Sequence, residues 1–200
     1  MKVNSLVFSS SEFQLGDAGT GTLLVSNEGK GAGTATVQLQ TDGRVLGQQP
    51  VSLGPGATQT VSIPFTTWGA GTFTVQALLD GQSKIVASLT VRAPALANAQ
   101  STHQDLTCKD HVPLHLTFQN GGDGVARNVM VAATIYNTNN VAQDSKQAAV
   151  GSVPAGGSGQ ADFDLFAPDT CGRDDYYHVT YVITPQYGEA LTATTPPFSL

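Results

Sequence analysis

Charged residues are scarce in this 200-residue chain: nine lysines and arginines and fifteen aspartates and glutamates make up 12% of it. The basic residues do not cluster, and a phosphate-binding surface needs clustered cations, which argues against a nucleic-acid partner. The same shortage argues against attachment to an anionic membrane surface. No apolar run reaches the roughly 18 to 20 residues of a membrane-spanning helix. We therefore expect no membrane contact from this segment.

The opening residues 1–5 also lack the apolar run of a signal peptide. The last residues, 194–200, resemble the end of a strand more than a free tail. We therefore expect the chain to be part of a longer polypeptide. Solubility must rest on neutral polar groups, because 40% of the residues are hydrophobic and the net charge is only −6.

Cysteine is limited to Cys108 and Cys171, the minimum for one disulfide. Each lies beside residues typical of loops, which favours a bridge over the alternative of two buried thiols. A bridge would close a loop of 171 − 108 = 63 residues, and on the chain-entropy model would stabilise the fold by about 4 kcal/mol. Such a bond persists in oxidising compartments, so the predicted location is extracellular or at the cell surface.

The sequence is internally duplicated. Residues 27–33 and 120–126 share an Asn-x-Gly-x-Gly pattern, and each follows a short apolar strand. A Gly-rich turn follows at residues 53–56 in one half and 153–156 in the other. The period, 120 − 27 = 93 residues, is the size of a small domain and too long for a solenoid repeat. The motif residues are Asn27, Gly29 and Gly31 in the first copy and Asn120, Gly122 and Gly124 in the second.

Apolar residues alternate with period two between Gly, Pro and Asn residues, which predicts β-strands throughout. The expected strands are residues 5–10, 21–27, 34–40, 43–51, 58–65, 71–79 and 84–92, and in the second copy 102–107, 112–120, 127–136, 141–151, 159–166, 176–184 and 190–198. Seven short strands per copy predict two tandem immunoglobulin-like antiparallel β-sandwiches. The predicted domains are residues 1–93 and 101–200, joined by a short linker at 94–100.

Turn chemistry accounts for the repeated motif. Asparagine bonds to local backbone and tolerates a left-handed conformation, and we expect the two glycines to adopt φ angles closed to other residues. A phosphate-binding role is disfavoured because no helix follows the glycines. Seven residues are added to the second copy, and we expect them around residues 137–140.

The first copy resembles the CARDB domain, a cell-adhesion-related immunoglobulin-like sandwich of bacterial and archaeal surface proteins. The resemblance rests on the strand region 8–15, residues 24–29, 40–43 and 53–56, and the strand 73–77. It extends less cleanly over residues 114–183, where the added loop and the cysteines depart from it. The resemblance implies a surface module, often in tandem, with a spacer or adhesive role and without catalytic residues.

Four aspartates near the second cysteine form the candidate metal site: Asp162, Asp164, Asp174 and Asp175. Calcium favours several carboxylates on converging loops, but the favoured interpretation is a solvated acidic edge that discourages aggregation. His111 and His115 lie four apart on one strand, roughly 13 Å from each other, too far to chelate together. A surface site formed with His178 is the alternative to ordinary exposed histidines. We predict no other cofactor.

Aromatic residues offer a candidate ligand-contact surface. Tyr177 and Tyr181 share the inward phase of their strand, which leaves Trp68, Tyr176 and Tyr187 for exposure. No Asn-x-Ser/Thr sequon is present, so N-glycosylation through that signal is not expected.

Three functions follow from these observations. The first is a non-catalytic extracellular spacer or adhesion module of a larger prokaryotic surface protein, whose partner is a protein or surface polymer. The second is a self-associating filament or sheath subunit that exchanges strands. The third is an accessory carbohydrate-binding domain of a surface enzyme. The sequence contains no convincing nucleophile or paired catalytic base.

Overall fold

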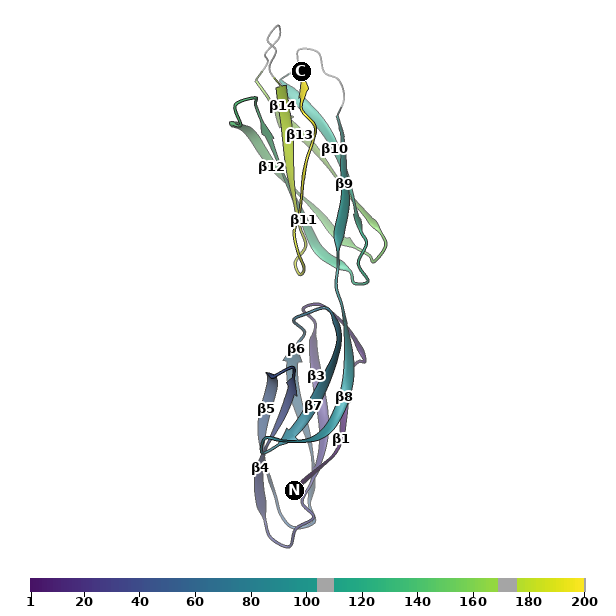
Figure 1. The fold of residues 1–200 in the computed structure, drawn as a ribbon, viewed down its shortest axis with the longest axis vertical. Helices are drawn as coiled ribbons and strands as arrows, with labels where there is room; N and C mark the ends of the chain where they lie inside the picture. Colours follow the sequence, from purple (N-terminus) through teal and green to yellow (C-terminus); the bar gives the residue numbers. More distant parts are fainter. Residues whose placement is uncertain (104–109, 169–175, 200) are drawn as a thin grey trace. The chain divides into compact units, whose positions relative to one another are not determined.

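The computed structural model describes residues 1–103, 110–168 and 176–199, and in this part of the chain all regular structure is β-strand (Figure 1). The predicted all-β class is confirmed. The chain divides into two compact units, Met1–Arg92 and Ala93–Leu200. None of the described residues forms a helix of the length and apolarity needed to cross a membrane.

The first unit is a sandwich of two sheets. The smaller sheet has the order β1-β3-β6 and consists of β1 (Lys2–Phe8), β3 (Ala18–Ser26) and β6 (Thr58–Thr66). The larger sheet has the order β2-β8-β7-β4-β5 and consists of β2 (Glu12–Gln14), β4 (Gly33–Thr41), β5 (Arg44–Leu53), β7 (Gly71–Leu79) and β8 (Gln82–Arg92). Neighbouring strands are antiparallel, apart from the parallel pair β2 and β8.

The second unit repeats this arrangement. Its smaller sheet has the order β13-β10-β9 and consists of β9 (Leu96–His103), β10 (His111–Asn120) and β13 (Ser158–Phe166). The larger sheet has the order β12-β11-β14-β15, with β16 also paired to β14; its strands are β11 (Ala126–Tyr136), β12 (Ala142–Val153), β14 (Tyr176–Thr184), β15 (Leu191–Thr194) and β16 (Phe198–Ser199).

Each unit has its own hydrophobic core between its two sheets. The inward phase predicted for Tyr177 and Tyr181 is confirmed, since both are buried. The other alternating apolar residues of β6, β13 and β14 are buried as well: Val61, Ile63, Phe65, Ala161, Phe163, Leu165, Val179 and Ile183. Residues 129–133 form a continuous apolar run, so alternation alone does not give the strand phase around Met130. There Val129 and Val131 are buried while Met130 is 42% exposed, and the pairing with β12 is irregular between Val129 and Met130.

Asp80 and Gly81 form the hairpin turn that joins β7 to β8. Both residues have positive φ angles, 49° and 78°, as a primed two-residue turn requires. The seven residues added to the second copy lie in the hairpin of β11 and β12. They are shared between a longer connection, residues 137–141 in place of 42–43, and strands that are each two residues longer than β4 and β5.

The segment 94–100, expected to be a linker, begins a strand. Leu96, the first residue of β9, already pairs with Asn120 of β10. Ala93 belongs to the second unit. The small residues of this segment indicated a flexible connection, yet they also alternate, and Leu96 and Ala99 pack against the core of the second unit.

Candidate functional site

The repeated motif is a buried asparagine that joins three segments of its unit. In the first unit Asn27 is only 4% exposed. Its Nδ2 donates to the carbonyls of Gly31 and Leu53, at 2.8 and 3.0 Å, and its Oδ1 accepts from the Gly29 amide at 3.0 Å. Its backbone pairs with the turn at residues 56–57. The side chain therefore fixes the end of β3 to the connection between β5 and β6.

In the second unit Asn120 makes the same connections and one more. Its Nδ2 donates to the carbonyls of Gly124, Val153 and Pro154, at 2.8, 3.1 and 3.2 Å. Its Oδ1 accepts from the Gly122 amide at 3.2 Å and from the Ala95 amide at 3.1 Å. The bond from Ala95 attaches the segment that leads into β9.

The expectation that this motif needs positive φ angles is wrong. Neither asparagine and none of the four motif glycines adopts one. The second unit shows why glycine is needed there: a Cβ on Gly122 would lie 2.4 Å from the Ala93 carbonyl oxygen, and a Cβ on Gly124 would lie 2.6 Å from the Ala93 nitrogen. Close approach of another backbone segment, rather than a special φ angle, requires these glycines.

That segment is Ala93 to Ala95, and the turn holds it by its backbone. The Ala93 amide donates to the Asp123 carboxylate at 3.0 Å, and the Ala93 carbonyl accepts from Gly124 at 2.9 Å. The Ala95 carbonyl accepts from Gly121 at 2.9 Å. Pro94, between them, has no amide proton to satisfy. The turn at residues 120–124 thus binds the backbone of three extended residues.

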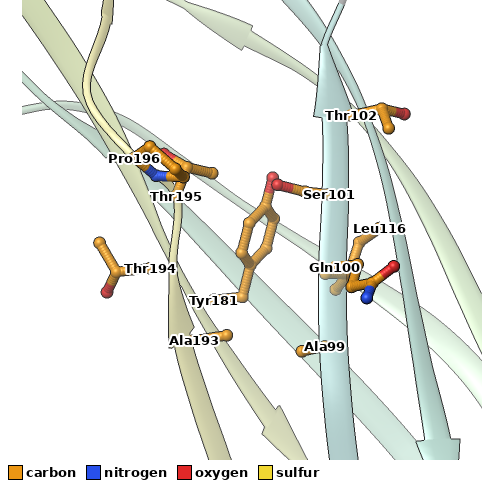
Figure 2. A pocket seen from close by; sticks show the side chains of 10 residues that line it. All are labelled: Ala99, Gln100, Ser101, Thr102, Leu116, Tyr181, Ala193, Thr194, Thr195 and Pro196. Carbon is orange, nitrogen blue, oxygen red and sulfur yellow. The ribbon is translucent and has the colours of Figure 1, made fainter.

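A second feature is a hollow of about 370 Å³ on one side of the second sandwich, between β9 of the smaller sheet and β15 of the larger one (Figure 2). Ten residues line it: Ala99, Gln100, Ser101, Thr102, Leu116, Tyr181, Ala193, Thr194, Thr195 and Pro196. None of these side chains is charged. Both strands are edge strands in the described part of the unit.

Tyr181 lies at the base of this hollow and points its hydroxyl group toward Ser101 (Figure 2). Burial raises the pKa of the Tyr181 phenol, and the contact with the Ser101 hydroxyl opposes that shift. The sequence predicted Tyr181 as a core residue, correctly. It contained no signal for the hollow, because that depends on how far apart β9 and β15 lie.

The candidate metal residues pair with histidines. Asp162 and Asp164 lie on the outer face of β13. Asp162 Oδ1 lies 2.6 Å from His115 Nδ1, and Asp164 Oδ2 lies 3.3 Å from His111 Nδ1. Asp174 and Asp175 are outside the described residues, as are Cys108 and Cys171. No group of three or more His, Cys, Asp or Glu residues that could hold a metal ion occurs in the described part of the chain.

The other histidine of the predicted surface site, His178, belongs to the other sheet. His178, on β14, stacks on Tyr136 of β11 with ring centroids 5.2 Å apart. His115 lies on β10 of the smaller sheet. The two-histidine surface site considered above would have to join residues of opposite sheets.

The three candidate aromatic residues are divided between the two units. Trp68, in the first unit, is half-buried, packs on Phe73 at 5.3 Å and lies under the Arg44 guanidinium at 4.6 Å. Tyr176 and Tyr187, in the second, are 51% and 37% exposed. Tyr176 begins β14 and Tyr187 follows its other end, so the length of that strand separates them, roughly 26 Å.

These features define a class of protein: an all-β chain of immunoglobulin-like sandwiches whose distinctive polar side chains organise backbone. Residues 6–91 match the family model of CARDB, which is a family of non-catalytic immunoglobulin-like domains. The first unit is a CARDB domain. A second CARDB copy in residues 101–200 stays a prediction.

Two of the solved structures that the chain resembles illustrate the similarity. One is red sea bream transglutaminase, with a TM-score of 0.35 and 14% identity over 97% of this chain and 31% of the other. The second is the Yersinia pseudotuberculosis adhesin InvE, with a TM-score of 0.35 and 15% identity over 100% of this chain and 60% of the other. The chain thus spans less than two thirds of either structure. A comparison with curated proteins finds no match.

Proposed function

We propose that this chain is a non-catalytic cell-surface module that acts outside the cell in adhesion or protein interaction. The observation that supports it best is the CARDB match of residues 6–91. The site geometry agrees with it, because the buried asparagines and the glycines beside them hold backbone and activate no nucleophile.

The hollow between β9 and β15 is the proposed contact surface. Edge strands present unpaired backbone amides and carbonyls, and an extended segment of a partner adds to such an edge through backbone hydrogen bonds. Neutral side chains line the hollow, so the favoured partner segment is extended and uncharged. A sugar-binding role would need the aromatic residues to share one surface, and within the second unit Tyr176 and Tyr187 lie at opposite ends of β14.

The test uses microspheres coated with the purified chain and counted for retention on intact cells of the source organism under flow. We expect retention above that of albumin-coated spheres. Retention no higher than albumin would contradict an adhesive role. Protease treatment of intact cells tests the location: an extracellular module is cleaved without lysis.

A matched pair of variants tests the surface. Ala193→Trp fills the hollow, whereas Thr192→Trp places the same ring one residue earlier on the same strand, at an exposed position that does not line the hollow. We expect Ala193→Trp to lower retention to the albumin level and Thr192→Trp to preserve it. Equal loss in both variants would place the contact elsewhere. Light scattering over a range of concentrations reveals strand exchange between copies as reversible polymers, which would favour the filament function instead.

A further inference from the structure

The two units place the same turn at the same point of the fold. Asn27 directly follows β3 and Asn120 is the last residue of β10. Each donates to the carbonyl that lies three residues before the glycine of the next turn, Leu53 before Gly56 in one unit and Val153 before Gly156 in the other. The backbone bonds also match: the Gly56 amide donates to Asn27, and the Gly156 amide donates to Asn120, both at 2.8 Å.

The incoming strands match as well. In the first unit Lys2 pairs with Ser26, the residue before Asn27, and in the second Ala97 pairs with Gln119, the residue before Asn120. Lys2 therefore corresponds to Ala97. By the same register the bound segment Ala93 to Ala95 corresponds to the three positions directly ahead of Met1.

The surroundings of the glycines differ between the units. In the second, backbone atoms of Ala93 lie 2.6 to 2.7 Å from the position of a Cβ on Gly124. In the first, the equivalent residue Gly31 has no neighbouring heavy atom within 4 Å of that position, and Gly29 meets only the Oδ1 of Asn27, at 3.1 Å. At Gly31 neither a positive φ angle nor crowding within the first unit requires glycine, and at Gly29 only the close approach of the Asn27 side chain opposes a Cβ.

We propose that residues 27–31 form a docking site for the backbone of an extended segment of small residues and proline that enters the first unit directly ahead of β1. The bonds in the second unit specify how it binds. The amides of Glu28 and Gly31 occupy the positions of the Gly121 and Gly124 donors, and the Oδ1 of Asn27 occupies that of the Asn120 acceptor.

One residue of the site differs between the units and restricts which segment can bind in the first. Asp123 accepts from the first bound amide in the second unit, at 3.0 Å, and Lys30 stands at the corresponding place in the first. A lysine ammonium donates hydrogen bonds and cannot accept them. The first residue of the segment therefore contributes its carbonyl alone, or an acidic side chain toward Lys30. This site is independent of the adhesive function proposed above.

The test extends the full chain by Arg-Ala-Pro-Ala, a copy of residues 92–95, fused ahead of Met1. Amide hydrogen exchange at Glu28 and Gly31 should slow by about fivefold, the effect of one hydrogen bond of ordinary net strength. The control is Gly31→Ala in the extended chain. Its Cβ has open space in the unextended protein but would collide with a docked backbone, so the variant should fold normally and show no slowing.

Three results would overturn the proposal. Unchanged exchange on extension removes the docking site. Equal slowing with and without Gly31→Ala assigns the effect to something other than backbone docking at that glycine. The third is that the free peptide acetyl-Arg-Ala-Pro-Ala-amide at millimolar concentration slows exchange whereas the fused extension does not. The occupant of the site would then be a separate chain rather than a segment joined to β1.

Discussion

Replacing Asn120 with alanine removes a side chain that is completely buried and bonded to five backbone groups. The two protons of its amide are shared among three carbonyls and count as two hydrogen bonds, and its Oδ1 accepts two more. The side chain therefore contributes about four hydrogen bonds. At about 1 kcal/mol net for each bond, the expected loss of stability is about 4 kcal/mol. Asn27→Ala breaks three such bonds and should cost about 3 kcal/mol on the same reckoning.

The assay is urea unfolding followed by two probes. Trp68 is the only tryptophan and lies in the first unit, so its fluorescence reports that unit. Hydrogen exchange in β10 and β14 reports the second. We expect Asn120→Ala to lower the urea midpoint of the second unit by about 2 M, at a typical slope of about 2 kcal/mol per M, and to leave the Trp68 transition in place. Asn27→Ala should do the reverse.

Asn139→Ala is the matched control, because Asn139 is exposed in the loop after β11. Its stability should stay within about 0.5 kcal/mol of the parent. A loss below about 1 kcal/mol for Asn120→Ala would refute the argument that the side chain joins three segments. So would equal effects on both probes, because the bonds of Asn120 lie within one unit.

Three further predictions concern the second unit. Gly159→Ala would place a Cβ 2.3 Å from the ring of Phe118, so it should destabilise the unit by about 1 to 3 kcal/mol in urea unfolding. The bond from the Phe166 amide lowers the pKa of the Asp144 carboxyl. The ionised carboxyl therefore stabilises the fold above its usual pKa of about 4, and this stabilisation is lost as pH falls through the lowered pKa. The urea midpoint of Asp144→Asn should lack that acid dependence. Burial raises the pKa of Tyr181, so stability should fall as pH rises above about 10 in the parent, and less in Tyr181→Phe.

The strands and the core were predictable because each sandwich has one buried and one exposed face on most strands. Alternation with period two then records which face is inside. Phe163 and Tyr181 could be assigned to the core on that basis alone. The same rule gave no phase at Met130, because residues on both faces of β11 are apolar there and the irregular pairing with β12 has no sequence signal.

The candidate sites were less predictable because they depend on partners that are distant in sequence. Asp162 and Asp164 suggested calcium when considered as carboxylates, and only the register of β10 against β13 brings His115 opposite Asp162. The hollow beside Tyr181 depends on two edge strands separated by about ninety residues. Residues 94–100 looked like a linker because their small side chains match one, and the bonds that hold Ala93 come from residues near 121–124.

The duplication supplies what one copy alone could not. Gly56 and Gly156 both have positive φ angles, 70° and 71°, so one local requirement explains glycine at both positions. Gly31 and Gly124 also match in sequence, but only Gly124 has a neighbour that excludes a side chain. Glycine at both positions, with a local reason at only one of them, indicates that both positions serve the same role. In the second unit that role is to bind the segment that enters the unit. Gly31→Ala and Gly124→Ala therefore distinguish a local requirement for glycine from a requirement set by a bound segment. Gly31→Ala should leave the free energy of unfolding unchanged or raise it by up to about 1 kcal/mol. Gly124→Ala should release Ala93 and destabilise the second unit.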